Sequence, residues 1–92
     1  MPALSDAEVT ARLGGVAAWK VESGELTRTF TFKDFRAALA FVNKVGEAAE
    51  KAGHHPDIDI RYNRVRLALV THDAGGLTTK DFDLAAEADK LA

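Results

Sequence analysis

Helix start signals are the feature that most restricts how this chain of 92 residues can fold, because they divide it into helical and extended stretches. Three segments carry a capping-box pattern, a hydroxyl at the N-cap followed three residues later by a carboxylate: Ser5 to Glu8, Thr31 to Asp34 and Thr78 to Asp81. Apolar residues recur at helical spacing after each of them. The sequence therefore predicts a short helix ending at Gly14-Gly15, a long helix ending at Gly53, and a third helix from about Thr79 to the C-terminus.

Strand patterns occupy the stretches between these helices. Residues 17–22 and 26–32 flank Ser23-Gly24-Glu25 and predict a hairpin. Residues 57–62 alternate, with Ile58, Ile60 and Tyr62 on one side, and a turn at Asn63-Arg64 leads into a fourth strand over residues 65–72. The order α-β-β-α-β-β-α predicts an α+β fold, a four-stranded antiparallel sheet with three helices on one face, in a single domain spanning residues 1–92.

Composition excludes several classes of function. A formal net charge of −2 without a basic run argues against nucleic-acid binding. The absence of cysteine excludes thiol catalysis, disulfides and Cys-ligated zinc. The first residues lack the pattern of a signal peptide, and no apolar run is long enough to span a membrane. We therefore expect a cytoplasmic protein that binds neither nucleic acid nor membrane.

The three histidines of the chain all lie in its second half. His54 and His55 are adjacent and precede Pro56, which favours an extended, stiff backbone before the third strand. His72 closes the predicted fourth strand, which pairs with the third through a short turn. That pairing brings His72 back beside the start of the third strand, so the sequence predicts that all three imidazoles converge at one end of one hairpin.

Four interpretations of these histidines stay open on the residues alone. They can form a polar connector without function, or a three-histidine zinc site, which is disfavoured because adjacent histidine side chains diverge. They can serve general acid–base catalysis, since imidazole exchanges protons near neutral pH. They can also belong to a ligand-binding or assembly module without chemistry.

Arg61, Arg64 and Arg66 lie close together in the sequence, with Asp57 and Asp59 nearby, and are interpreted as a solvated mixed-charge face.

Several ordered motifs resemble those of the pterin-4a-carbinolamine dehydratase family. They are His54-His55-Pro56 within residues 50–57, Tyr62-Asn63 before Val65, and Thr71-His72 followed by Gly76-Leu77. Upstream, Trp19 and residues 30–35 are similar to the first hairpin and helix start of that family. The resemblance covers essentially the whole chain, and the matching spacing of the whole set makes it much more specific than His-His-Pro alone.

This resemblance implies the same α+β fold and an assembly that is a homodimer or a homotetramer. It implies an enzyme that removes water from a 4a-hydroxytetrahydropterin to give quinonoid dihydropterin, with no metal and no organic cofactor. The reaction recycles the pterin cofactor of aromatic amino-acid hydroxylases, so a functional link to such a hydroxylase is expected. The alternative is a non-catalytic pterin-binding, assembly or coactivator module on the same fold.

The resemblance also implies roles for individual residues. The expected catalytic residues are His54, His55 and His72, and the expected substrate-binding segments add Pro56, Thr71, Asp73 and Ala74, with the backbone at positions 73 and 74 mattering more than the side chains. Glu50 and Asp81 are the expected supporting carboxylates. Glu50 either orients an imidazole or lies on a solvated helix face. Asp81 either orients a histidine or caps the last helix, and the capping pattern favours the second role.

Overall fold

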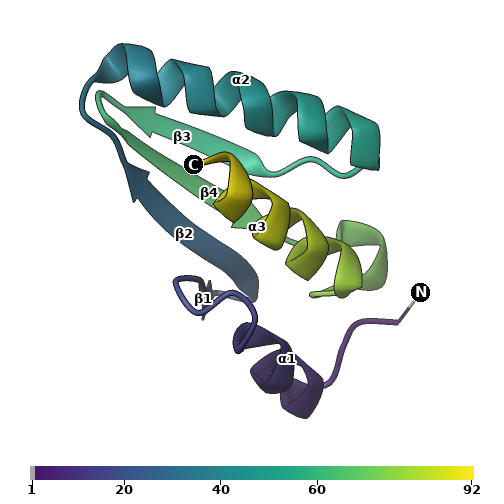
Figure 1. Cartoon of the computed structure of the whole chain (residues 1–92). Helices are drawn as coiled ribbons and strands as arrows, with labels where there is room; N and C mark the ends of the chain where they lie inside the picture. The colour runs from purple at the N-terminus through teal and green to yellow at the C-terminus, as the bar shows by residue number, and fades with distance from the viewer. Residues whose placement is uncertain (1) are drawn as a thin grey trace.

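The structure is a computed structural model that describes residues 2–92 (Figure 1). Its helices are α1 (Asp6–Leu13), α2 (Phe35–Ala52) and α3 (Thr79–Leu91), and its strands are β1 (Lys20–Glu22), β2 (Glu25–Thr31), β3 (Asp57–Arg61) and β4 (Arg64–Leu69). A single 3₁₀ turn, η1 (His72–Ala74), precedes α3. The predicted order of helices and strands and the α+β class are confirmed.

The four strands form one antiparallel sheet in the order β1-β2-β4-β3. Strand β2 pairs with β4 from Leu26↔Leu69 to Thr31↔Arg64, so the two central strands come from different hairpins. Strands β1 and β3 are the edges of the sheet. Figure 1 shows α2 and α3 side by side over one face of the sheet, with α1 beyond the β1 end.

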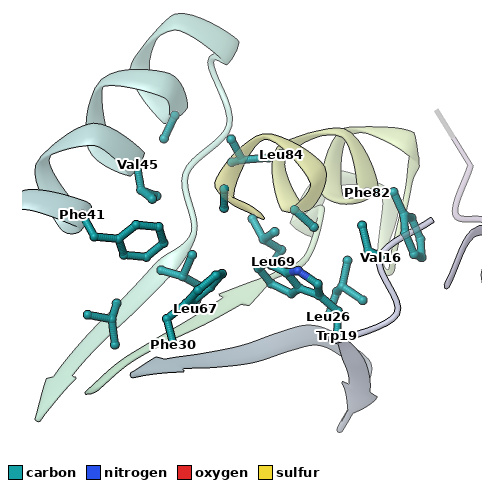
Figure 2. Close-up of a cluster of buried hydrophobic side chains, with 14 of the residues drawn as sticks. Val16, Trp19, Leu26, Phe30, Phe41, Val45, Leu67, Leu69, Phe82 and Leu84 are labelled. Carbon is teal, nitrogen blue, oxygen red and sulfur yellow. The ribbon is translucent and has the colours of Figure 1, made fainter. Parts of the chain in front are cut away.

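The core lies between the sheet and these helices (Figure 2). Alternate residues of the central strands point into it, and α2 contributes a stripe at helical spacing; the buried set includes Leu26, Phe30, Val65, Leu67, Leu69, Ala38, Phe41, Val45 and Ala49. Trp19 packs against Phe30 in this core. Its indole N–H donates to Asp89 Oδ1 at 2.8 Å, which joins the first hairpin to the end of α3.

The predicted capping box at the start of α2 is wrong. Thr31 is the last residue of β2 and pairs with Arg64, and the next backbone N–H, that of Phe32, donates to the Asn63 carbonyl oxygen at 2.8 Å. The chain therefore passes Thr31 without a cap and bends at Lys33 and Asp34. The Asp34 side chain accepts a hydrogen bond from the Ala37 N–H at 2.8 Å and acts as the N-cap. The reciprocal capping boxes of α1 and α3 are confirmed.

The turn between β3 and β4 lies one residue earlier than the sequence predicts. Arg61 pairs directly with Arg64, so Tyr62 and Asn63 form the turn. Tyr62 has a left-handed φ of 51° and is 66% exposed, and it does not share the face of Ile58 and Ile60 as predicted. The Asn63 side-chain amide donates to the Phe32 carbonyl oxygen at 2.8 Å, and this bond across to the end of β2 holds the turn in its register.

The predicted first strand is also too long at its start. Residues 17–19 do not pair, because the chain turns there and the Trp19 N–H donates to the Val16 carbonyl oxygen at 2.9 Å. The turn buries Val16 and Trp19 and leaves β1 with only three residues. The chain therefore buries Trp19 in the core instead of extending the pairing of β1 back to residues 17–19.

Two glycines, one inside α2 and one directly after it, should respond to alanine in opposite directions. Gly53 ends the helix with a left-handed φ of 64°, whereas Gly46 lies inside the helix, and a Cβ at either position meets no atom within 4 Å. We expect Gly53→Ala to lower the free energy of unfolding by about 1 kcal/mol, because only its backbone conformation is strained. Gly46→Ala should raise it by about 0.5–1 kcal/mol. Urea denaturation of both variants measures the difference, and equal effects would contradict the prediction.

Candidate active site

His54 is the least exposed of the three histidines, with 12% of its side chain accessible. The left-handed Gly53 ends α2 and turns the chain toward β3, so His54 begins the short connector between them. Its ring Nε2 lies 2.6 Å from Asp81 Oδ1 at the start of α3. One hydrogen bond therefore links the end of α2 to the first turn of α3.

Asp81 is completely buried and uses both of its carboxylate oxygens. Oδ2 accepts hydrogen bonds from the Thr78 backbone N–H and from the Thr71 hydroxyl, both at 2.9 Å. Oδ1 faces His54. The sequence offered helix capping and histidine orientation as alternatives for this residue, and the geometry lets Asp81 do both at once.

The hydrogen bonds around Asp81 have a definite direction. The Thr71 hydroxyl gives its proton to Asp81, so the Thr78 hydroxyl, 2.8 Å away, must donate to Thr71. With Asp81 accepting at Oδ2, the proton between Oδ1 and the imidazole is best assigned to His54 Nε2. Of the two ring nitrogens of His54, Nδ1 is therefore the one left without a hydrogen-bond partner in the described part of the chain.

His55 pairs with a different carboxylate. Its Nε2 hydrogen-bonds to Glu50 Oε2, one turn back in α2, and both side chains are exposed. Glu50 thus orients His55 and not His54. Because the pair is exposed to solvent, we expect it to set the direction of the ring while adding little to stability.

The predicted strand ending at His72 is wrong, because β4 stops at Leu69. Thr71 instead bridges to Gly76, and its N–H donates to the Gly76 carbonyl oxygen at 3.1 Å. The six-residue loop closed by this bridge contains η1, which His72 opens, and Gly75 completes it with a φ of 73°. The loop takes the chain out of the sheet at the point where the sequence predicted continued pairing.

The structure brings some of the predicted site residues together and leaves others apart. His54, Thr71 and Asp81 form one hydrogen-bonded group, and His55 forms a second with Glu50. The side chains of His72 and Asp73 are exposed, whereas Pro56 and Ala74 are half-buried. Within residues 2–92 the His72 ring has no hydrogen bond to either of the other imidazoles. His72 is connected to the first group through its neighbour Thr71, whose hydroxyl donates to Asp81.

A cleft of about 1020 Å³ opens between α2 and α3 next to His54. Its walls include Ala48 and Lys51 from α2 and Leu84 and Leu91 from α3. His55 and His72 do not line it. A ligand confined to this cleft would therefore meet His54 and neither of the other two imidazoles.

Two further properties of the described residues bear on function. Across residues 2–92, no three side chains of histidine, aspartate or glutamate are grouped so that they could hold a metal ion. In the same part of the chain, every helix is too short or too polar to cross a lipid bilayer.

Sequence reasoning missed Thr78 as part of the site. Its hydroxyl accepts a hydrogen bond from the Lys80 N–H at 3.3 Å and lies against Thr71, so it continues the hydrogen-bond chain that ends at Asp81. The capping-box pattern identified Thr78 and Asp81 as a pair. Nothing in that pattern indicates that the second carboxylate oxygen faces a histidine 27 residues earlier in the chain.

Comparisons with known proteins agree with this architecture. Residues 2–91 match the family described as pterin 4 alpha carbinolamine dehydratase. A protein of Acidobacterium capsulatum, whose provisional name is pterin-4-alpha-carbinolamine dehydratase, is 63% identical over 99% of both chains. A transcriptional coactivator/pterin dehydratase from Brucella melitensis has a similar crystal structure, with a TM-score of 0.94, 34% identity and 98% of each chain covered.

A more distant structure shares only the fold. It is a pterin dehydratase-like protein identified as a RuBisCO assembly factor in the alpha-carboxysome, with a TM-score of 0.66 and 24% identity. The similarity covers 80% of this chain and 86% of that one. The same sheet and helices therefore occur in proteins described by quite different roles.

Proposed function

This chain belongs to the pterin 4 alpha carbinolamine dehydratase family, and we propose that it catalyses the dehydration of a 4a-hydroxytetrahydropterin to quinonoid dihydropterin. His54, His55 and His72 are the proposed acid–base and binding residues. In this reaction the C4a–O bond breaks and the proton on ring nitrogen N5 is removed. A proton joins the departing hydroxyl to form water, and a double bond forms between N5 and C4a.

The observation that carries this proposal is the hydrogen bond between His54 and the buried Asp81. It holds the imidazole in one orientation and occupies Nε2, so Nδ1 is the nitrogen that takes or gives the proton. A base held in this way needs little reorganisation when the substrate binds, and positioned imidazoles typically accelerate proton transfer by about 10²–10⁴-fold. His55 and His72 are exposed and are the proposed partners for the departing hydroxyl and the pterin ring.

The proposed substrate contacts come from two backbone segments. One is the connector of His54, His55 and Pro56, and the other runs from Thr71 through His72 and Asp73 to Ala74. Because Thr71 and His54 share Asp81, the two segments are held side by side. Backbone N–H and C=O groups of such segments can pair with the flat edge of a pterin. In this proposal no metal or organic cofactor takes part, and the product returns to the cofactor pool of an aromatic amino-acid hydroxylase in the cytoplasm.

The test is the rate of quinonoid dihydropterin formation from freshly prepared 4a-carbinolamine, measured spectrophotometrically with and without the protein. We expect a clear acceleration over the spontaneous reaction, saturable in substrate and unchanged after treatment with a chelator. A rate equal to the spontaneous one would contradict the enzyme proposal and leave a binding or assembly module. Elemental analysis that finds a stoichiometric metal ion would contradict the metal-free mechanism.

The proposed assembly is a homodimer or homotetramer in which a second copy covers the β3 side of the molecule. Phe35 and Leu39 lie one turn apart on α2, and Ile58 lies on β3; all three are exposed large apolar residues. Figure 1 shows α2 running alongside β3, an edge strand whose outer backbone groups have no partner in the sheet. A symmetric partner would bury the apolar side chains and could also pair with this edge.

Substitution of Leu39 should show whether this side is the interface. We expect Leu39→Glu to lower the molar mass measured by sedimentation equilibrium at micromolar concentration, because it places a charge in a buried apolar contact. Val21→Glu is the matched control, since Val21 is 41% exposed and Leu39 is 39% exposed, but Val21 lies on the opposite edge strand β1. The proposed interface is wrong if Val21→Glu dissociates the assembly and Leu39→Glu does not.

A further inference from the structure

Three arginines cluster on the face of the sheet that α2 and α3 leave uncovered. Val65 and Leu67 of β4 are buried on the helix side, so the alternate residues Arg64 and Arg66 point to the opposite face. Arg61 of β3 lies directly across from Arg64 and shares that face. We refer to Arg61, Arg64 and Arg66 as the arginine cluster.

The carboxylates around the arginine cluster do not neutralise it. Arg61 Nε lies 3.4 Å from Asp59 Oδ2, and Arg66 Nη2 lies 3.4 Å from Glu22 Oε1. Glu22 is shared among several donors, because it also accepts a hydrogen bond from the Thr27 hydroxyl at 2.8 Å and pairs with Lys20 at 3.4 Å. Arg64 has no ion-pair partner within residues 2–92. At least one guanidinium is therefore free to bind an external anion.

The arrangement of the arginine cluster also has an energetic cost. Like charges directly opposite each other in an antiparallel pair are destabilising, and Arg61 and Arg64 are such a pair. The chain as a whole carries a net charge of −2, so positive charge is concentrated here against the overall balance. An anion that bridges the two guanidiniums would remove this repulsion.

The cluster surrounds a hollow of about 240 Å³ on the sheet surface. Its lining residues are Thr29, Asp59, Arg61, Arg64 and Arg66, which supply three guanidinium groups and one hydroxyl against a single carboxylate. The sequence predicted a solvated face of mixed charge here, but in this hollow the positive groups outnumber the negative one. Thr29 lies across from Arg66 on β2, so its hydroxyl can add a donor to those of the arginines.

We infer that this hollow binds the phosphate group of a small ligand. The planar guanidinium forms paired hydrogen bonds with phosphate oxygens, and several arginines around one hollow match the three oxygens and the double charge of a phosphate monoester. Fixed strand positions hold the cluster, so little backbone order has to be gained on binding. The hollow lies on the opposite face of the sheet from the helix-side group of His54 and Asp81, and it has no part in the proposed dehydration.

The test is a titration of the ¹⁵N-labelled protein with sodium pyrophosphate at constant ionic strength, followed by ¹H–¹⁵N correlation spectra. We expect saturable shifts at residue 29 and residues 59–66 and none at residues 54, 71 and 81. Arg64→Gln should weaken binding at least about tenfold, and Asp59→Asn should strengthen it by removing the competing carboxylate. Arg36→Gln, at an exposed arginine of α2, is the matched control and should bind like the wild type.

Several outcomes would overturn the inference. They are shifts that do not saturate or that spread over all basic residues, unchanged binding by Arg64→Gln, and displacement of pyrophosphate by an acidic peptide at equal charge concentration, which would assign the face to an acidic protein partner. Arg61→Gln provides a second variant if Arg64→Gln is poorly folded. The readout is binding and not turnover, so it is independent of the dehydratase assay.

Discussion

Replacing His54 by alanine should lower kcat/KM for carbinolamine dehydration by about 10²-fold or more. The variant loses the one imidazole that, within residues 2–92, is oriented by a buried carboxylate, and with it the free Nδ1 that we assign to proton transfer. Stopped-flow measurement of quinonoid formation, corrected for the spontaneous reaction, gives the ratio to wild type. His55→Ala and His72→Ala, measured in the same way, divide the remaining acceleration between the two exposed histidines.

A second substitution at the same position separates chemistry from structure. His54→Gln retains an N–H donor that can reach Asp81 but cannot transfer a proton near neutral pH. It should fold like the wild type and be as slow as His54→Ala. Lys33→Ala, an exposed residue before α2, controls for general effects of substitution and should keep the wild-type rate. Wild-type activity in His54→Gln would show that His54 only positions other groups.

Asp81→Ala should be the most destabilising single substitution in the site, lowering the free energy of unfolding by about 3–5 kcal/mol. It leaves three donors without their acceptor: the Thr78 N–H, the Thr71 hydroxyl and the His54 imidazole. An unsatisfied buried donor typically costs about 1–3 kcal/mol, and loss of a helix cap is included in that total. Urea denaturation monitored by circular dichroism measures the change.

Two other aspartates provide a graded comparison for Asp81. Asp34 caps α2 by accepting one backbone N–H, so Asp34→Ala should cost about 1 kcal/mol. Asp83 is exposed on α3 and has no hydrogen bond from its side chain within the described residues, so Asp83→Ala should change stability by less than about 0.5 kcal/mol. If Asp81→Ala lowers the free energy of unfolding no more than Asp34→Ala does, the Asp81 carboxylate contributes only helix capping to stability.

Much of the fold was predictable because local signals and burial agree along most of the chain. Capping boxes located α1 and α3, the left-handed Gly53 located the end of α2, and alternation located the buried face of β4. The errors occur where a distant residue decides the local conformation. Thr31 looks like an N-cap, but its pairing with Arg64 keeps it in β2, and Asn63 moves the turn because it bonds to the end of β2.

The sequence provided candidate residues for the site but not the geometry in which they lie. The resemblance to a known family pointed to the histidines and to Glu50 and Asp81. Which carboxylate serves which imidazole depends on tertiary contact, because Glu50 is close to both His54 and His55 in the sequence and bonds only to His55. The Thr78 hydroxyl was missed because it acts through Thr71, and their hydrogen bond exists only once the η1 loop has closed.

The strand order β1-β2-β4-β3 has a consequence for how this protein folds. The hairpins β1–β2 and β3–β4 connect neighbouring residues and can form within microseconds. The central pairing of β2 with β4 must wait until the intervening chain, including all of α2, has been brought together, so we expect this long-range closure to limit the folding rate. Substitutions in β2 such as Leu26→Ala should then slow refolding in stopped-flow experiments, whereas substitutions in β1 should mainly accelerate unfolding.

His54 and Thr71 lie outside the strands joined by that closure, at the far ends of β3 and β4. Their hydrogen bonds to Asp81 would therefore form late, after the strands of the sheet have paired.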